Sequence, residues 1–150
     1  MKTQELGAIV DELLARSFPR EEEHDGDRSS GPSYHVQVLC ASQDFWEDRS
    51  EEIVEAAEAE IEAARQGLTE VLTARWGNPE PFDLWPLEED PAPEPIDQLS
   101  MLSTRMHLWR HATPDRWVAL LVGQQDAEFP IELLAAVSDA PIRAPKSPRP

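Results

Sequence analysis

The chain has only one cysteine, six glycines and two lysines among its 150 residues. With Cys40 alone, no intramolecular disulfide can form, and nothing points to an oxidising compartment. The glycines are not clustered, so the sequence has no phosphate-binding loop, and it has no G-x-S-x-G nucleophile elbow. These absences remove the common short signatures of nucleotide-binding and hydrolytic enzymes.

Long apolar runs are also missing. No stretch approaches the roughly 18 consecutive apolar residues of a membrane span, and residues 1–10 lack the apolar segment of a secretory signal. We therefore expect a soluble, cytoplasmic protein with no membrane partner. At 150 residues and 40% hydrophobic content, the chain is expected to form one domain with a substantial core.

Positive charge is scarce, because 30 acidic residues face 13 Lys and Arg and give a formal net charge of −17. Such a surface opposes approach to nucleic acid, so no direct nucleic-acid contact is expected, and it favours a basic partner. Solubility alone is the simpler explanation of the charge. The preference for Arg over Lys, with abundant Ala and Pro, suits a high-GC bacterial genome.

The strongest strand pattern lies between residues 99 and 137. Residues 117–122 form a continuous apolar run, typical of a strand covered on both faces, and Pro114 suits the turn before it. The flanking segments alternate apolar and polar residues with a period of two. We predict an antiparallel meander of strands 101–111, 116–123 and 128–137, with Pro130 marking an edge strand or the start of the last one.

Two helices and one further strand precede this meander. Residues 3–17 have an amphipathic pattern that ends before Pro19, and residues 51–76 form a longer helix that Gly77 closes. Residues 34–41 alternate as a strand, in which Cys40 is expected to pack as a small apolar residue. The predicted fold is α+β: a sheet of about four strands with the long helix across one face.

The chain is predicted to have three parts. Residues 1–32 comprise the first helix and a flexible acidic linker, residues 33–138 the core domain, and residues 139–150 a disordered Pro-rich tail. Inside the core domain, residues 77–98 contain six prolines and seven acidic residues and no basic residue. A loop of this length in a compact domain is often functional or disordered.

The candidate binding residues lie on the long helix and in this loop. Four glutamates share one helix face at spacings of three and four, and a solvated face usually mixes the two signs of charge. An acidic solvated face, or a loop latched on its own core, is the simpler interpretation. The candidates for contact with a partner are Glu51, Glu55, Glu58, Glu62, Asp83, Trp85, Glu88 and Glu89.

Catalytic chemistry has few candidates. His107 and His111 share a strand face, but zinc needs more ligands than this pair supplies. Carboxylate pairs are too numerous to single one out. We therefore predict no catalytic residue, no metal, no cofactor and no enzymatic activity.

The leading hypothesis is a non-enzymatic protein that docks a basic protein through its acidic surface. The layout is similar, in architecture only, to small bacterial immunity proteins and secretion chaperones. One alternative is a small-molecule-binding or catalytic domain with a pocket between helix and sheet, lined by Trp85, Trp109 and His107. Another is a structural subunit of a larger assembly, or a homodimer, that pairs through the strand at 129–137.

Overall fold

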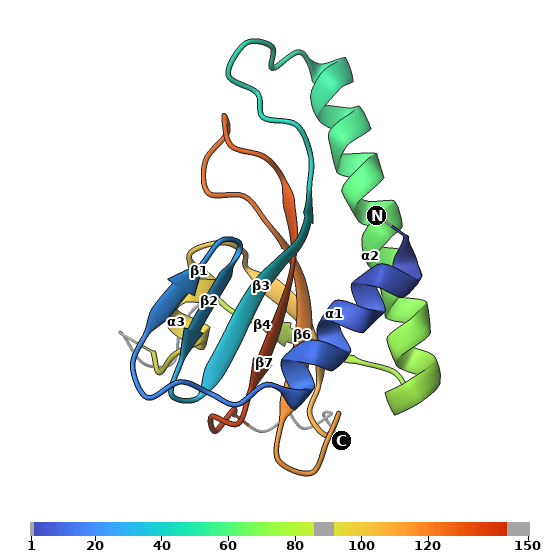
Figure 1. The fold of residues 1–150 in the computed structure, drawn as a ribbon. Coiled ribbons are helices and arrows are strands. Elements are labelled where there is room, and N and C mark those ends of the chain that lie inside the picture. Colours follow the sequence, from blue (N-terminus) through green and yellow to red (C-terminus); the bar gives the residue numbers. More distant parts are fainter. Residues whose placement is uncertain (1, 86–91, 144–150) are drawn as a thin grey trace, which may run out of the picture.

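The computed structural model describes residues 2–85 and 92–143 and shows an α+β fold. A seven-stranded antiparallel sheet has the strand order β1-β2-β3-β7-β6-β5-β4, and the long helix lies along it (Figure 1). The elements are α1 (Thr3–Ala15), β1 (Glu23–Asp25), β2 (Arg28–Gly31), β3 (Tyr34–Ala41), α2 (Glu51–Trp76), β4 (Glu80–Asp83), α3 (Ile96–Ser100), β5 (Arg105–Trp109), β6 (Trp117–Gly123) and β7 (Glu132–Ser138).

The central strands β6 and β7 are buried on both faces, as the apolar run at 117–122 predicts. Val118 and Leu120 point to the face that carries α1 and α2, whereas Ala119 and Leu121 point to the opposite face. All four side chains are at most 1% exposed. The sheet therefore separates two apolar cores.

Each core has its own covering elements. On one face, α1 and α2 contribute their apolar stripes, which are Leu6, Val10 and Leu13 from α1 and Ala57, Ile61, Leu68 and Leu72 from α2. On the other face, the cover comes from α3 and the segment after β4, with Leu99 and Leu84 as buried members, and Phe82 of the edge strand β4 joins the same core. Among the described residues, no helix combines the length and apolar character needed to cross a membrane.

The prediction of about four strands is too low. Two of the additional strands, β1 and β2, form a hairpin in the segment that we predicted as a flexible linker. Gly26 has a φ of +60° at the first position of its two-residue turn, where glycine is favoured. The charged strands of this hairpin lack apolar alternation, so only the Gly-Asp turn could have indicated it.

The third additional strand, β4, lies in the predicted loop 77–98, and α3 begins near the end of that loop. The strand pairs with β5 as an edge, where Pro81 is tolerated because one side of the strand needs no ladder bond. The prediction of an edge position for the last strand is wrong, since β7 pairs with β3 and β6. That strand begins at Glu132, so the predicted start at residue 128 is too early, and the strand predicted at 101–111 is limited to β5, Arg105–Trp109.

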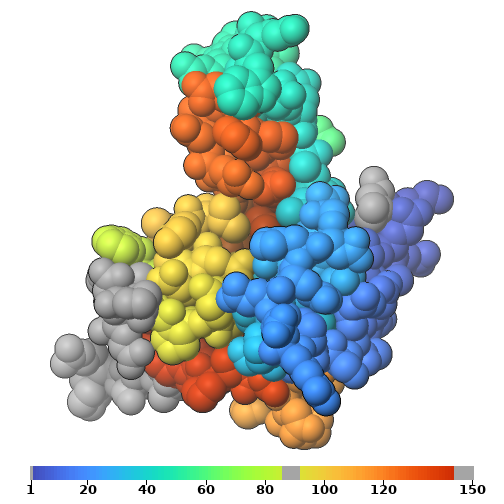
Figure 2. Space-filling view, turned by 60° about the vertical axis from the view of Figure 1, so that its left-hand side comes forward, coloured from blue at the N-terminus to red at the C-terminus, as the bar shows by residue number. Residues whose placement is uncertain are grey.

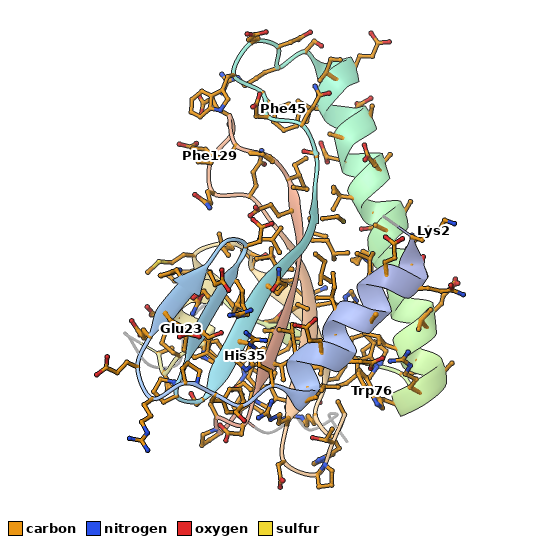
Figure 3. All side chains as sticks on the ribbon, viewed as in Figure 1. Lys2, Glu23, His35, Phe45, Trp76 and Phe129 are labelled. Atoms are coloured by element: carbon orange, nitrogen blue, oxygen red, sulfur yellow. The ribbon has the colours of Figure 1, made fainter. Side chains whose placement is uncertain are left out.

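Two side chains distant in sequence, Arg116 just before β6 and His35 in β3, satisfy the C-terminal end of α1. The Arg116 guanidinium donates to the carbonyl oxygens of Leu13, Leu14 and Arg16 at 3.1, 3.2 and 2.7 Å. His35, which lies beside this end of the helix (Figure 3), has Nε2 3.2 Å from the Arg16 carbonyl oxygen. These bonds supply partners for carbonyl groups that a helix end leaves open.

The hydrogen bonds of His35 assign its tautomer. Nε2 faces a carbonyl oxygen and must donate, so Nδ1 accepts from the Ser30 hydroxyl at 2.6 Å. Burial lowers the pKa of His35, although the bond to the Arg16 carbonyl opposes this effect. The neutral imidazole is the form that fits this buried position.

We predict that Arg116→Met destabilises the protein by about 2 kcal/mol, because three charge-assisted bonds are lost and helix carbonyls are left open. Arg75→Met is the control, since Arg75 also bonds to α1, through Asp11 at 2.7 Å, but on the surface. Its cost should stay below about 1 kcal/mol. Urea unfolding measures both, and equal costs would contradict the anchoring role of Arg116.

We also predict that the free energy of unfolding falls as the pH drops below the ordinary histidine value of about 6.5. In that range the unfolded chain takes up a proton that the folded protein excludes from His35. His107, whose pKa is lowered mainly by burial, acts in the same direction. Urea unfolding of the wild type and His35→Gln from pH 8 to pH 5 should show a smaller loss in the variant.

Candidate partner-binding surface

Residues 42–63 and 124–131 form a strongly acidic surface, which we call the acidic lobe. It comprises the segment before α2, the N-terminal half of α2 and the β6–β7 connection. In the space-filling view, the segment before α2 and the β6–β7 connection project together from the body of the protein (Figure 2).

Backbone hydrogen bonds and one buried aromatic ring hold the two connecting segments of the lobe together. The Phe45 N–H donates to the Glu128 carbonyl at 2.8 Å, and the Ser42 N–H donates to the Ile131 carbonyl at 2.8 Å. The Phe45 side chain is only 1% exposed and belongs to the core beneath α1 and α2. The lobe is thus an ordered extension of the fold.

More than half of the net charge of the chain is concentrated in these 30 residues. The lobe contains eleven acidic residues and one basic residue, Arg49, which gives a net charge of −10 out of −17. Arg49 pairs with Glu128 at 3.0 Å. Within the described part of the chain, nine of the eleven carboxylates have no ion pair, and these are Asp44, Glu47, Asp48, Glu51, Glu52, Glu55, Glu58, Glu60 and Asp126.

A large aromatic side chain is exposed among these charges. The Trp46 side chain is 61% exposed, and its ring lies 5.4 Å from the half-buried ring of Phe129. Burying an indole of this size is a common source of affinity at protein interfaces. Trp46 therefore adds an apolar contact point to a surface that is otherwise negative.

The four predicted glutamates of α2 lie on the acidic lobe, but the surroundings of Glu62 differ from those of the other three. Glu51, Glu55 and Glu58 are exposed. Glu62 is half-buried and is hydrogen-bonded by the Arg65 guanidinium, which lowers the pKa of this carboxyl group. The charge of Glu62 is thus largely compensated, whereas the other three charges face solvent without a partner among the described residues.

The predicted loop residues lie elsewhere. Asp83 is the last residue of β4, on the outermost strand of the sheet, and bonds to Arg105 at 3.2 Å. Trp85 follows this strand and is 62% exposed. No contact found among the described residues joins either one to the helix glutamates. Glu88 and Glu89 lie outside the described residues.

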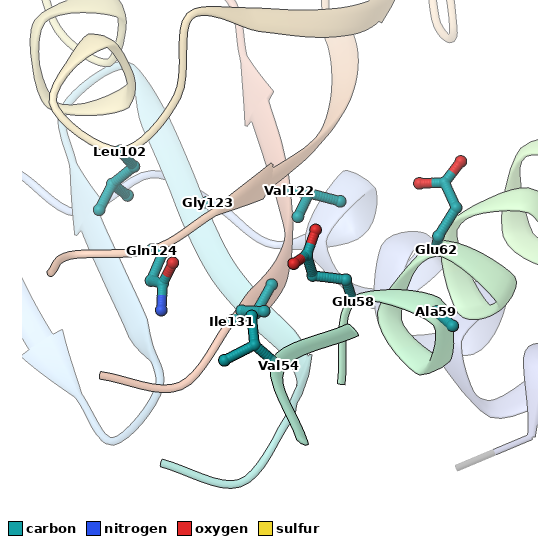
Figure 4. Close-up of a pocket in the computed structure, with 9 residues that line it drawn as sticks. All are labelled: Val54, Glu58, Ala59, Glu62, Leu102, Val122, Gly123, Gln124 and Ile131. Atoms are coloured by element: carbon teal, nitrogen blue, oxygen red, sulfur yellow. The ribbon is translucent and has the colours of Figure 1, made fainter. Parts of the chain in front are cut away.

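A groove of about 660 Å³ opens between α2 and the end of β6. Figure 4 shows Glu58 reaching from α2 toward Val122 and Ile131, while Glu62 lies farther along the helix. The lining combines apolar walls with three polar side chains, and its members are Val54, Glu58, Ala59, Glu62, Leu102, Val122, Gly123, Gln124 and Ile131.

The pairing of β5 with β6 stops before the end of β6, at the edge of this groove, although β5 itself continues beside β4. The last residue pair between β5 and β6 joins His107 to Leu120, so residues 121–123 continue with β7 as their strand neighbour. Beyond that point the chain before β5 covers part of the edge, since the Gln124 N–H donates to the Leu102 carbonyl at 3.4 Å. Gly123 lies close beside Leu102, which leaves no room for a side chain.

The pocket predicted from Trp85, Trp109 and His107 is not the one observed, since none of the three lines this groove. Trp109 is 3% exposed, donates from Nε1 to the Gly77 carbonyl at 2.9 Å and packs edge-on against Trp76. His107 is half-buried and faces Arg65 and Glu62 of α2. Burial lowers its pKa, Arg65 adds to this effect and Glu62 opposes it.

The described residues also provide no support for a metal site. Residues 2–85 and 92–143 contain no group of three His, Cys, Asp or Glu side chains placed to hold a metal ion. Cys40 is half-buried against the core beneath the helices, and burial raises the pKa of its thiol. A raised pKa disfavours the reactive thiolate.

The part that the segment before α2 and the β6–β7 connection take in the acidic lobe is not predicted from the sequence. Trp46 and the residues at 124–131 were not among the candidates, although Trp46, Asp126 and Phe129 belong to the acidic lobe. Their proximity to α2 depends on the pairing of β3 with β7, which brings residues 91 to 104 positions apart into neighbouring strands. The only local signal was the string of acidic and aromatic residues at 44–48.

Comparison of the chain with protein-family models, with curated proteins and with solved structures gives no match.

We predict that two adjacent aromatic residues of the lobe differ sharply in their effect on stability. Phe45→Ala should destabilise the protein by about 3–5 kcal/mol, because it empties a buried site. Trp46→Ala should cost less than about 1 kcal/mol, because the side chain is mostly in solvent. Thermal and urea unfolding measure both. A large loss for Trp46→Ala would show that this residue serves the fold rather than a partner.

Proposed function

We propose that this protein is a non-enzymatic binding module that docks a basic protein partner through the acidic lobe. The observation that carries the proposal is the concentration of unpaired carboxylates, with a net charge of −10, around one exposed tryptophan on a projecting part of the fold. Carboxylates brought this close repel one another, and a cationic surface relieves that repulsion.

The lobe also has a fixed conformation, which is a favourable property of a binding interface. Phe45 and the hydrogen bonds between the two segments hold it in place before binding, so little ordering entropy is lost on association. Its charges steer a positive partner over distances of about one Debye length, which is roughly 8 Å at physiological ionic strength.

We include two specific roles in this proposal, an immunity protein and a secretion chaperone. An immunity protein that neutralises a cationic toxin and a chaperone for a secreted effector both need a preformed acidic surface and no catalytic group. Both fit a cytoplasmic bacterial protein.

The groove between α2 and β6 favours one alternative, a small-molecule-binding protein. A ligand of drug size fills a cavity of several hundred Å³, and the groove has that volume. Mass spectrometry of the purified native protein discriminates between the two, because a stoichiometric small molecule released on denaturation favours the alternative. Assembly through the last strand has no such support, since β7 is an interior strand.

The test of docking is affinity capture from native lysate by the immobilised chain. We compare the wild type with a variant carrying Glu51→Gln, Glu55→Gln and Glu58→Gln. We expect one basic protein to bind the wild type and elute at moderate salt, and we expect this triple variant to bind it at least about tenfold more weakly. The affinity is then measured by calorimetry with the purified partner.

The matched control carries Glu5→Gln, Glu21→Gln and Glu22→Gln. These residues are also exposed glutamates, and the substitutions change the net charge by the same amount at positions outside the lobe. This control should retain binding within about twofold. Equal losses in the two triple variants would show that the total charge, rather than the lobe, determines the binding.

A further inference from the structure

The groove beside Glu58 has a chemistry more specific than negative charge. Its walls are apolar where Val54, Val122 and Ile131 meet, and one unpaired carboxylate, Glu58, reaches over them (Figure 4). The neighbouring carboxylate, Glu62, is already hydrogen-bonded to Arg65. The groove therefore presents one uncompensated negative charge above an apolar surface.

A second polar group lies in the same groove. The Gln124 side-chain amide nitrogen donates to the Phe129 carbonyl at 2.8 Å, which fixes the orientation of this side chain. Within residues 2–85 and 92–143, no hydrogen bond is found to its carbonyl oxygen, which is available as an acceptor. A carboxylate and an amide carbonyl suit a ligand with several N–H donors.

We propose that this groove receives an arginine side chain of the protein partner, so that the arginine is the specific anchor of the docking proposed above. The aliphatic stem lies along Val54, Val122 and Ile131, and the guanidinium meets Glu58 and the carbonyl oxygen of Gln124. An arginine fits better than a lysine, because a guanidinium is more weakly hydrated and offers five donors in a planar fork. The inference rests on the proposed function, because the arginine belongs to the docked partner.

The volume of the groove is consistent with this occupant. A space of about 660 Å³ exceeds what one side chain fills, so the peptide segment that carries the arginine can enter with it. Ala59 keeps the rim open, since it is an exposed, small residue on the lining of the groove. An arginine inserted in a pocket is also a frequent hot spot of protein interfaces.

The test uses n-butylguanidinium as the probe and the full chain labelled with ¹⁵N and with ¹³C at its methyl groups. We expect saturable NMR shifts at Val122, Gly123 and Gln124 and at the methyl groups of Val54 and Ile131. The neutral analogue n-butylurea should bind at least about fivefold more weakly, which corresponds to about 1 kcal/mol for one ion pair. n-Butylammonium should bind more weakly than the guanidinium, and the reverse order would overturn the choice of arginine.

Two pairs of variants locate the site. Glu58→Gln should weaken the guanidinium about fivefold, whereas Glu60→Gln, an equal charge change on the same helix outside the groove, should leave binding unchanged. Ala59→Phe should block the groove, whereas Ala63→Phe, at an exposed position that does not line it, should not. Equal effects of Glu58→Gln and Glu60→Gln would reduce the binding to general attraction of cations and overturn the inference.

The outcome separates this inference from the docking proposal. Absence of groove shifts up to the solubility limit of the probe overturns the arginine site, even where the triple variant of the lobe loses a captured partner. Groove binding without any captured partner leaves the site established for the guanidinium and contradicts only the docking of a basic protein.

Discussion

The structure depends on one constraint, which is that the central strands β6 and β7 carry apolar side chains on both faces. Leu120 and Leu121 are adjacent in sequence, point to opposite sides and are at most 1% exposed. Each buried leucine contributes about 2 kcal/mol, but only where a second layer excludes water. One face is covered by α1 and α2 and the other by α3 and the segment after β4, so the segments around the sheet are arranged by this need for two covers.

The acidic lobe is a consequence of the difference in length between the helix α2 and the strands that it covers. The 26 residues of α2 span about 39 Å, whereas the seven residues of β7 span about 24 Å. The C-terminal part of the helix buries Leu68 and Leu72 against the sheet, and the N-terminal part runs past its end. There the helix is covered by the segments at 42–50 and 124–131 rather than by strands, and its outer side is free to carry glutamates. The groove lies where this cover and the end of β6 leave a gap.

The parts of the fold with strong periodicity could be predicted from the sequence. The bounds of α2 and β3 agree with the residue patterns, and the continuous apolar run at 117–122 identified a strand buried on both faces. The hairpin β1–β2 and the strand β4 have no such periodicity, because each strand is three or four residues long and, apart from Phe82, its residues are polar, proline or glycine. Their positions are set by pairing with β3 and β5 across the sheet.

The candidate site was predictable only in part. Glu51, Glu55 and Glu58 were identified by helical spacing, but the same spacing did not distinguish Glu62, whose charge is compensated by Arg65. Asp83 and Trp85 belong to a different region, on and beside the outermost strand. Trp46 and Gln124 entered the site only through the pairing of β3, β6 and β7, which no local pattern reveals.

The most direct test of the central claim is the ionic-strength dependence of the association rate with the captured basic partner. Stopped-flow measurements compare the wild type with the variant lacking the charges of Glu51, Glu55 and Glu58. Steering by the lobe predicts that the wild-type rate falls steeply with added salt, while the variant starts lower and has a shallower dependence. Equal rates and equal salt dependence for the two proteins would show that the lobe does not guide the partner, and would contradict the account.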